Sequence, residues 1–403
     1  MEKFRLENGA TVVLAECVLS GVSVSATVNV GHVNEPKLGI ASLYENVLMK
    51  QFPKVQTVYG GTITSYITGC EAAELDETLA KMAQMFKQPC LDDEVIRSAA
   101  EDIAEHTRDL APLTKRQMKL LYKHTAFGKK RVLWDADSYI EAVESYTAED
   151  LKEFADKYYT AKNLVIVVAG KKLDKNDFAA KLEQYFGDIP SGERQRVNKK
   201  SIYTGGFNEL RPNGNYNQVM LGWDVTDIKG SSSANVMMSM LAKRLERSFN
   251  EVEVDGKKIS RPSDAEIEVK IAGYYGYRTL RISVKSAQFS TNEIIDLITK
   301  NVVRLQNSLA SERRMETSKN WAMAEKLWLF SQPQPAAVET AWQLLGRENM
   351  YDINERIGHI WEVSEYEVQA ISRDIFTGSP LTLVVATQEP HYSYKEVQEK
   401  LKI

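Results

Sequence analysis

Apolar residues recur along this chain with two spacings. Residues 22–30 alternate between apolar and polar side chains, as in a strand with one buried face, whereas 164–169 and 381–386 are unbroken apolar runs, as in strands buried on both faces. The dipeptide Asn8-Gly9 is typical of a tight hairpin turn. Helical spacing predicts amphipathic helices over seven other stretches: 41–50, 75–86, 92–108, 147–158, 234–249, 291–308 and 314–328. Within each half of the chain, strands are followed by helices and then by strands again. This order predicts an α+β fold, with helices packed on one face of each sheet.

The chain contains an internal repeat. Residues 146–170 align without a gap with 363–387, at an offset of 217 residues that relates Thr160 to Thr377. Each copy begins with a hydroxyl residue that can cap a helix and with an acidic first turn. Each then continues as an amphipathic helix and ends in one of the two buried strands. Two helix–turn–strand units in one register indicate a duplicated domain.

The domain organisation follows from this offset. A chain of 403 residues exceeds what one hydrophobic core usually organises, and the offset is about half of that length. We therefore predict a first repeat over 1–190 and a second, homologous repeat over 206–403. The linker is placed at 191–205, directly after Pro190, where glycine and charged residues interrupt the apolar periodicity.

Composition excludes several classes of protein. The formal net charge is −4, from 51 basic and 55 acidic residues, which predicts no general attraction to nucleic acid or to anionic membranes. Three cysteines without a C-x-x-C spacing indicate neither a disulfide framework nor a thiolate zinc site. No apolar run approaches the ~18 residues of a membrane span, and the first residues have no apolar leader segment. The chain as written is expected to be cytoplasmic, an expectation that a trimmed leader would change.

The predicted helix at 39–50 has two distinct faces. One face is apolar, and the other carries the polar residues Ser42, Glu45 and Asn46 together with Met49. Because residues three and four apart are neighbours on a helix, these polar groups lie within one turn of each other. The apolar face consists of Ile40, Leu43, Tyr44, Val47 and Leu48.

This helix resembles the zinc-site helix of the pitrilysin/insulinase-type metallopeptidases, whose inverted motif is H-x-x-E-H. The hairpin at residues 6–13 is similar to the opening of that family, and 158–170 is similar to the strand that closes its repeated domain. Residues 322–345 and 363–385 look like the same region of a second repeat. The resemblance implies two repeats, each an antiparallel-rich sheet with helices on one face, that form half of a clamshell chamber.

The resemblance also implies where zinc would bind in an active relative. The two histidines of the motif correspond to Ser42 and Asn46, the general base corresponds to Glu45, and the third ligand corresponds to Glu101. Hydroxyl and carboxamide groups are poor zinc ligands beside imidazole. We therefore expect no zinc and no other cofactor, and we interpret Glu45 as a vestigial base. Without a metal, Glu45 and Glu101 are interpreted as solvated or salt-bridged helix carboxylates.

Two further features bear on this interpretation. The family's substrate-binding arginine corresponds to Asn250 in this chain, although a shifted alignment would bring Arg244 or Arg247 to that position. A metal site rescued by His106 or His32 is an alternative to a lost site. The tryptophans at 321, 328 and 342 are interpreted as packing in the core or at the interface between the two lobes, rather than as part of a ligand site.

These features together favour a non-catalytic protein. The resemblance implies that active relatives of this size often pair two such chains, so the leading hypothesis is a partner subunit of a zinc-bearing paralogue, or a peptide-binding pseudopeptidase. We expect weak self-association and a tighter heterodimer with the paralogue. The rivals are an active zinc metalloendopeptidase with an unrecognised ligand set, and a structural scaffold subunit that resembles respiratory-complex core proteins.

Overall fold

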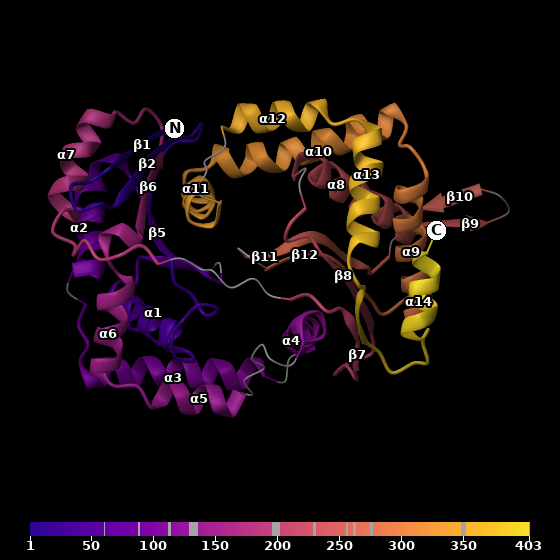
Figure 1. Ribbon diagram of the computed structural model, residues 1–403, viewed down its shortest axis with the longest axis horizontal. Helices are drawn as coiled ribbons and strands as arrows, with labels where there is room; N and C mark the ends of the chain where they lie inside the picture. The colour runs from indigo at the N-terminus through magenta and orange to yellow at the C-terminus, as the bar shows by residue number, and fades with distance from the viewer. Residues whose placement is uncertain are drawn as a thin grey trace. The chain divides into compact units, whose positions relative to one another are not determined.

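The computed structural model describes residues 1–59, 61–87, 89–111, 114–128, 136–195, 202–228, 231–254, 257–260, 263–274, 277–347 and 352–402. The chain forms two compact units (Figure 1). The first unit consists of Met1–Asp109, Trp134–Lys199 and Lys326–Ile353. The second consists of Leu110–Leu133, Lys200–Glu325 and Asn354–Ile403. Each unit therefore takes one segment from the other half of the chain.

The first unit is built on a mixed sheet with the strand order β1-β2-β6-β3-β5-β4. Strand β6 pairs parallel to β2, and every other neighbouring pair of strands in this sheet is antiparallel. The hairpin predicted at Asn8-Gly9 joins β1 to β2, and Gly9 has a positive φ of 97°. The strands are β1 Glu2–Arg5, β2 Thr11–Glu16, β3 Val22–Val28, β4 Gln56–Tyr59, β5 Thr64–Cys70 and β6 Leu164–Gly170.

The second unit repeats this path through a sheet with the strand order β11-β12-β8-β13-β7. Strand β13 pairs parallel to β7 and antiparallel to β8, just as β6 pairs with β2 and β3 in the first unit. The α+β prediction is therefore confirmed, with one mixed sheet in each unit. The strands are β7 Gly206–Leu210, β8 Asn217–Asp224, β11 Glu266–Tyr274, β12 Tyr277–Ser286 and β13 Thr382–Ala386, with a separate hairpin of β9 Glu251–Val254 and β10 Lys257–Ser260.

The helices follow the predicted repeat as well. Helix α6 begins at Ala148 and α13 begins at Glu365, and the residue before each closes a reciprocal capping box, from Thr147 to Asp150 and from Ser364 to Glu367. The first half contains α1 Ile40–Gln51, α2 Leu75–Lys87, α3 Asp93–Leu110, α4 Thr114–Phe127, α5 Ala136–Glu144, α6 Ala148–Tyr158 and α7 Lys175–Phe186. The second half contains α8 Ser231–Asn250, α9 Thr291–Asn307, α10 Glu312–Ser331, α11 Pro333–Arg347, α12 Ile353–Glu362, α13 Glu365–Gly378 and α14 Tyr394–Leu401.

The main core of each unit lies between its sheet and the helices of its own repeat. In the first unit, alternate residues of β2, β3 and β6 pack with α1, α2 and α6. In the second unit, alternate residues of β8, β12 and β13 pack with α8, α9 and α13. Among the described helices, none combines the length and the apolar character that a membrane span requires.

The opposite face of each sheet is partly covered by a helix from the other half of the chain. Helix α11 packs its alanines on β2, β5 and β6 of the first unit, and α4 packs on β7, β8 and β13 of the second unit. In Figure 1, α4 lies beside β7. Periodicity predicted helices on one face only, and the structure adds this exchanged helix on the other. The boundaries predicted for the sequence repeats, 1–190 and 206–403, stay a prediction.

Candidate functional site

Helix α1 is anchored by an aromatic cluster. The five residues of its predicted apolar face are buried, each exposed by 1% or less. The ring of Tyr44 contacts Phe154 edge to face at 5.6 Å between centroids, and it packs on Tyr159 at 4.5 Å. This confirms the predicted orientation of α1 and turns Ser42 and Asn46, both half-buried, away from the centre of the core.

The N-terminus of α1 is held by a carboxylate that lies upstream of it. Glu35 accepts hydrogen bonds from the backbone N–H of Gly39 at 2.9 Å and of Ala41 at 3.0 Å. Gly39 has a φ of 79°, and a Cβ there would lie 2.7 Å from Val143. Burial raises the pKa of Glu35 to about 7, against the opposing effect of the two hydrogen bonds. The start of α1 therefore depends on a carboxyl group that titrates near neutrality.

We expect Glu35 to make stability fall as the pH rises. Its folded pKa of about 7 lies above the ordinary value of 4.5, so the folded state binds the proton more tightly than the unfolded state does. The resulting stabilisation is complete below about pH 4.5 and is lost as the pH passes through about 7. At 1.36 kcal/mol per pKa unit, the change amounts to roughly 3 kcal/mol.

The measurement is urea unfolding of the wild type and of Glu35→Gln across this pH range. The variant should become more stable relative to the wild type as the pH rises. Glu141→Gln, which changes an exposed carboxylate on α5, serves as the control and should follow the wild type. Parallel pH profiles for the wild type and Glu35→Gln would contradict the assignment.

The polar residues of α1 bond mainly to each other. The side-chain amide of Asn46 donates to the backbone oxygen of Ser42 at 2.9 Å and to Oε2 of Glu45 at 3.0 Å. The hydroxyl of Thr57, on the edge strand β4, donates to Oε1 of Glu45 at 2.5 Å. Glu45 is only 4% exposed. The structure therefore brings Ser42, Glu45 and Asn46 together around one buried carboxylate.

Two tyrosines extend this buried polar group. The hydroxyls of Tyr66 and Tyr159 lie 2.6 Å apart, and both residues are buried. Burial is the main cause that raises the pKa of each hydroxyl well above its ordinary value, and the negative charge of Glu45 adds to the effect. Both hydroxyls therefore stay protonated near neutral pH. Periodicity predicted neither β4 nor β5, so Thr57 and Tyr66 were not recognised as neighbours of Glu45. Tyr159 directly follows the predicted helix at 147–158, but its contact with Tyr66 is tertiary and local patterns do not indicate it.

Glu101 lies on the exposed side of α3. Its carboxylate pairs with Arg97 on the same helix at 3.9 Å, and its side chain is 68% exposed. The buried side of α3 instead presents Ala100, Ile103, Ala104 and Thr107. The interpretation of Glu101 as a salt-bridged carboxylate agrees with this placement. The same interpretation of Glu45 as a solvated group is wrong, because Glu45 is buried.

The donor set at α1 does not fit zinc. Zinc sites in proteins use imidazole, thiolate or carboxylate ligands, and Ser42 and Asn46 offer a hydroxyl and an amide. The amide of Asn46 and the carboxylate of Glu45 already bond to each other. Within the described ranges, no group of three or more histidine, cysteine, aspartate or glutamate side chains is placed to hold a metal ion.

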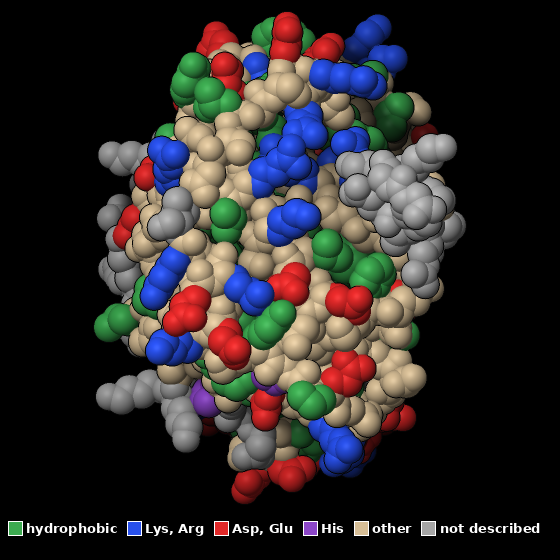
Figure 2. Space-filling model, turned by 90° about the vertical axis from the view of Figure 1, so that its right-hand side faces the viewer, with side chains coloured by type: hydrophobic (Ala, Val, Ile, Leu, Met, Phe, Trp, Pro, Cys, Tyr) green, Lys and Arg blue, Asp and Glu red, His purple; other side chains and the backbone are tan. Residues whose placement is uncertain are grey.

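The residues considered for substrate binding in the second unit have structural contacts. Asn250 ends α8: its amide donates to the backbone oxygen of Glu246, and its oxygen accepts from the backbone N–H of Ser263 at 3.0 Å. Arg247 pairs with Glu251 at 3.5 Å. Burial, followed by the nearby charges of two other arginines, lowers the pKa of Arg244 to about 10. Figure 2 shows Lys and Arg side chains gathered in the upper centre of one face of the molecule.

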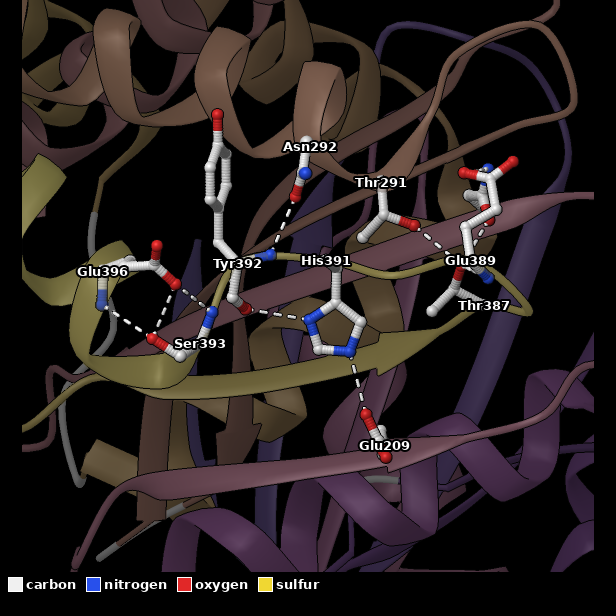
Figure 3. A network of polar contacts seen from close by, with 10 residues as sticks. Glu209, Thr291, Asn292, Thr387, Glu389, His391, Tyr392, Ser393 and Glu396 are labelled. Carbon is white, nitrogen blue, oxygen red and sulfur yellow. Dashed lines mark hydrogen bonds and ion pairs between the residues drawn. The ribbon is translucent and has the colours of Figure 1, made fainter.

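His391 belongs to a polar network that fastens the C-terminal segment to the second sheet (Figure 3). Its Nε2 lies 2.8 Å from Oε2 of Glu209 on β7, and its Nδ1 lies 2.8 Å from the backbone oxygen of Tyr392. Ser393 closes a capping box with Glu396 at the start of α14. Both ring nitrogens of His391 and the nearby serine hydroxyl are engaged in holding the chain, which favours a structural role. His32 and His106, the candidates for a rescued metal site, are exposed.

Comparisons with known proteins agree with the fold. A family model described as "Peptidase M16 inactive domain" matches residues 145–320, a stretch that does not include α1. The zinc protease PqqE of Helicobacter pylori (strain ATCC 700392 / 26695) is 26% identical over 192 residues, which are 42% of this chain and 43% of that protein. The match thus spans less than half the length of that relative.

Two solved structures share the complete architecture. A chain of complex III2 from Candida albicans, with Inz-5 bound, has a TM-score of 0.80 at 14% identity and covers 99% of both chains. A protease from Helicobacter pylori has a TM-score of 0.76 at 15% identity, over 96% of this chain and 99% of that chain. At such low identity these structures show the fold alone.

The two α+β units, each a mixed sheet with helices, give the chain the two-half architecture of these solved structures. The chain is similar to the M16 peptidases, the pitrilysin family of metallopeptidases, through the family model that matches residues 145–320 and the relative aligned over 192 residues.

Proposed function

We propose that this chain is a non-catalytic member of the M16 family that acts as the partner subunit of a zinc-bearing relative. The observation that carries the proposal is the bonding at α1. The two positions that match metal-binding histidines hold Ser42 and Asn46, and the amide of Asn46 is committed to its own helix. The carboxylate that matches the general base is buried and accepts a hydrogen bond from Thr57. These contacts leave α1 without the ligands of a peptidase centre.

Partnership is supported by side chains that stay exposed on the second unit. Trp321 on α10 is 54% exposed, Trp361 on α12 is 54% exposed, and Tyr366 on α13 is 64% exposed. The interpretation of Trp321 as a core residue is therefore wrong, as it is for Trp328, which is 58% exposed. Large aromatic side chains are enriched where proteins bind each other. A second chain would remove these rings from water.

Two other functions keep some support. A peptide-binding protein that works alone needs the same inert α1 and no partner. A scaffold subunit is favoured by the structural likeness to a chain of complex III2 from Candida albicans. An active zinc peptidase is disfavoured, because the described residues offer no alternative group of metal ligands.

The test pairs this chain with a relative from the same organism that retains H-x-x-E-H. Co-expressed and pulled down, the two should form a complex that cleaves a quenched fluorescent peptide, whereas this chain alone should not cleave it. Glu45→Gln in this chain should leave cleavage by the pair unchanged. The matched Glu→Gln change in the relative's own motif should lower cleavage by at least about a hundredfold, as loss of a general base does.

The proposal would be contradicted if the isolated chain cleaved the peptide and Glu45→Gln abolished that cleavage. A relative that is fully active alone and neither binds nor responds to this chain would leave the solitary peptide-binding protein as the better explanation.

A further inference from the structure

The sheet of the second unit has one apolar face and one mixed face. Leu280, Ile282 and Val284 of β12 point into the main core, so the intervening Arg281 and Ser283 point to the opposite face. Lys270 of β11 is the direct register partner of Arg281, which places both cations side by side on that mixed face. Strand β11 is also the edge of the sheet.

Helix α4 brings three more cations to the same face. Its Met118, Tyr122 and Ala126 pack on Met220, Val384 and Ala386 of the sheet. Lys115, Lys119 and Lys123 recur every fourth residue and therefore share one side of α4. We call the five side chains the basic face: Lys115, Lys119, Lys123, Lys270 and Arg281.

The members of the basic face act on one another electrostatically. Burial lowers the pKa of Lys119, and the positive charges of Lys115, Lys270 and Arg281 lower it further. Burial also lowers the pKa of Lys123, followed by the charges of Arg281 and Lys119. The Nε atom of Arg281 is enclosed and has no hydrogen-bond partner among the described residues. An enclosed guanidinium nitrogen without a hydrogen-bond partner is unfavourable, so Arg281 and its cationic neighbours would gain from an anionic ligand.

Local carboxylates compensate for little of this charge. Glu268, the acidic neighbour of Lys119, already forms an ion pair with Lys270. The next acid along β11, Glu266, pairs with Lys285 at 3.1 Å. The accumulation of positive charge is local, because the whole chain carries a formal net charge of −4.

The spacing of the cations selects an extended peptide. Residues four apart on a helix are separated by about 6 Å along its axis. In an extended peptide, side chains on one face repeat at roughly 6.6 Å. Glutamates at alternate positions can thus meet successive lysines of α4. Nucleic acid, which also carries regularly spaced charges, is disfavoured by the acidic character of the rest of the chain.

We propose that the basic face binds an acidic peptide segment with carboxylates at alternate positions, so that the second unit selects the ligand or partner segment by charge. The proposal rests on the non-catalytic, binding function proposed above and gives that function a ligand class. The aromatic ring of Tyr122 supports the site, since the guanidinium of Arg281 lies over it at 5.2 Å.

The experiment measures fluorescence anisotropy of a labelled peptide of alternating glutamate and serine with the full chain at low ionic strength. We expect the wild type to bind this peptide and to bind the matched glutamine–serine peptide at least tenfold more weakly, which corresponds to about 1.4 kcal/mol. Lys119→Gln with Lys123→Gln should weaken binding of the acidic peptide by roughly the same factor. Lys152→Gln with Lys171→Gln removes equal charge from exposed positions of the first unit and should bind like the wild type.

Each outcome decides the proposal. If the wild type binds the acidic peptide and the glutamine–serine peptide equally well, the proposal is overturned. It is also overturned if the Lys119→Gln/Lys123→Gln variant, with an unchanged unfolding transition, binds the acidic peptide as tightly as the wild type. Tighter binding of a single-stranded oligonucleotide than of the acidic peptide would overturn it in favour of nucleic acid. Because the readout is binding, a chain that cleaved peptides through its own zinc would refute the proposed function and leave this result standing.

Discussion

Replacing Gly222 with alanine should weaken the second unit by about 2–3 kcal/mol, because helix α4 lies directly against this glycine. A Cβ at Gly222 would lie 1.8 Å from the hydroxyl oxygen of Tyr122 and 2.6 Å from its Cζ. Tyr122 is only 1% exposed and packs in the cluster that fixes α4 on the sheet, so its ring has little room to shift. Either α4 moves away from β8, or the strand distorts.

The measurement is the free energy of unfolding in urea. Gly358→Ala is the matched control: this glycine lies inside α12, nothing lies within 4 Å of a Cβ there, and alanine should stabilise the helix by about 0.5–1 kcal/mol. Tyr122→Phe removes the atom that a Cβ would meet first. The double variant should therefore be more stable than the sum of the single changes predicts. A Gly222→Ala variant as stable as the wild type would show that α4 is not seated on this glycine.

The second large effect concerns zinc. Replacing Ser42 and Asn46 together with histidine should create a zinc site on α1, because two imidazoles one turn apart flank Glu45 on the half-buried side of the helix. The site should be weak, since Glu101, the candidate third ligand, is directed to solvent with Arg97. We therefore expect the variant to bind zinc and the wild type not to bind it, and neither to cleave peptides.

Much of the fold could be predicted from the sequence because local patterns determine it. The strands over 164–169 and 381–386, the hairpin at Asn8-Gly9 and the capped helices α6 and α13 depend on side chains close in sequence. The exchange of α4 and α11 could not be predicted, because periodicity does not indicate which sheet a helix covers. For α4, the apolar stripe is also narrow, and the lysines of the basic face lie beside it.

The site was predictable in composition but not in environment. Motif spacing identified Ser42, Glu45 and Asn46, and helical geometry gave the correct buried face of α1. The burial of Glu45 depends on Thr57 of β4, a short strand whose pairing with β5 is a tertiary contact. The exposure of Trp321 and Trp328 is likewise a property of how helices pack, which residue type alone does not indicate.

The zinc content of the purified chain tests the central claim most directly. The wild type, expressed without chelator and dialysed against zinc-free buffer, is measured by elemental analysis beside the Ser42→His/Asn46→His variant. The lost donor set predicts far less than one zinc per wild-type chain, with a higher content in the variant. Near one zinc per wild-type chain, reduced when Glu45 or Glu101 is replaced by alanine, would contradict the claim and identify a metal site built from other residues.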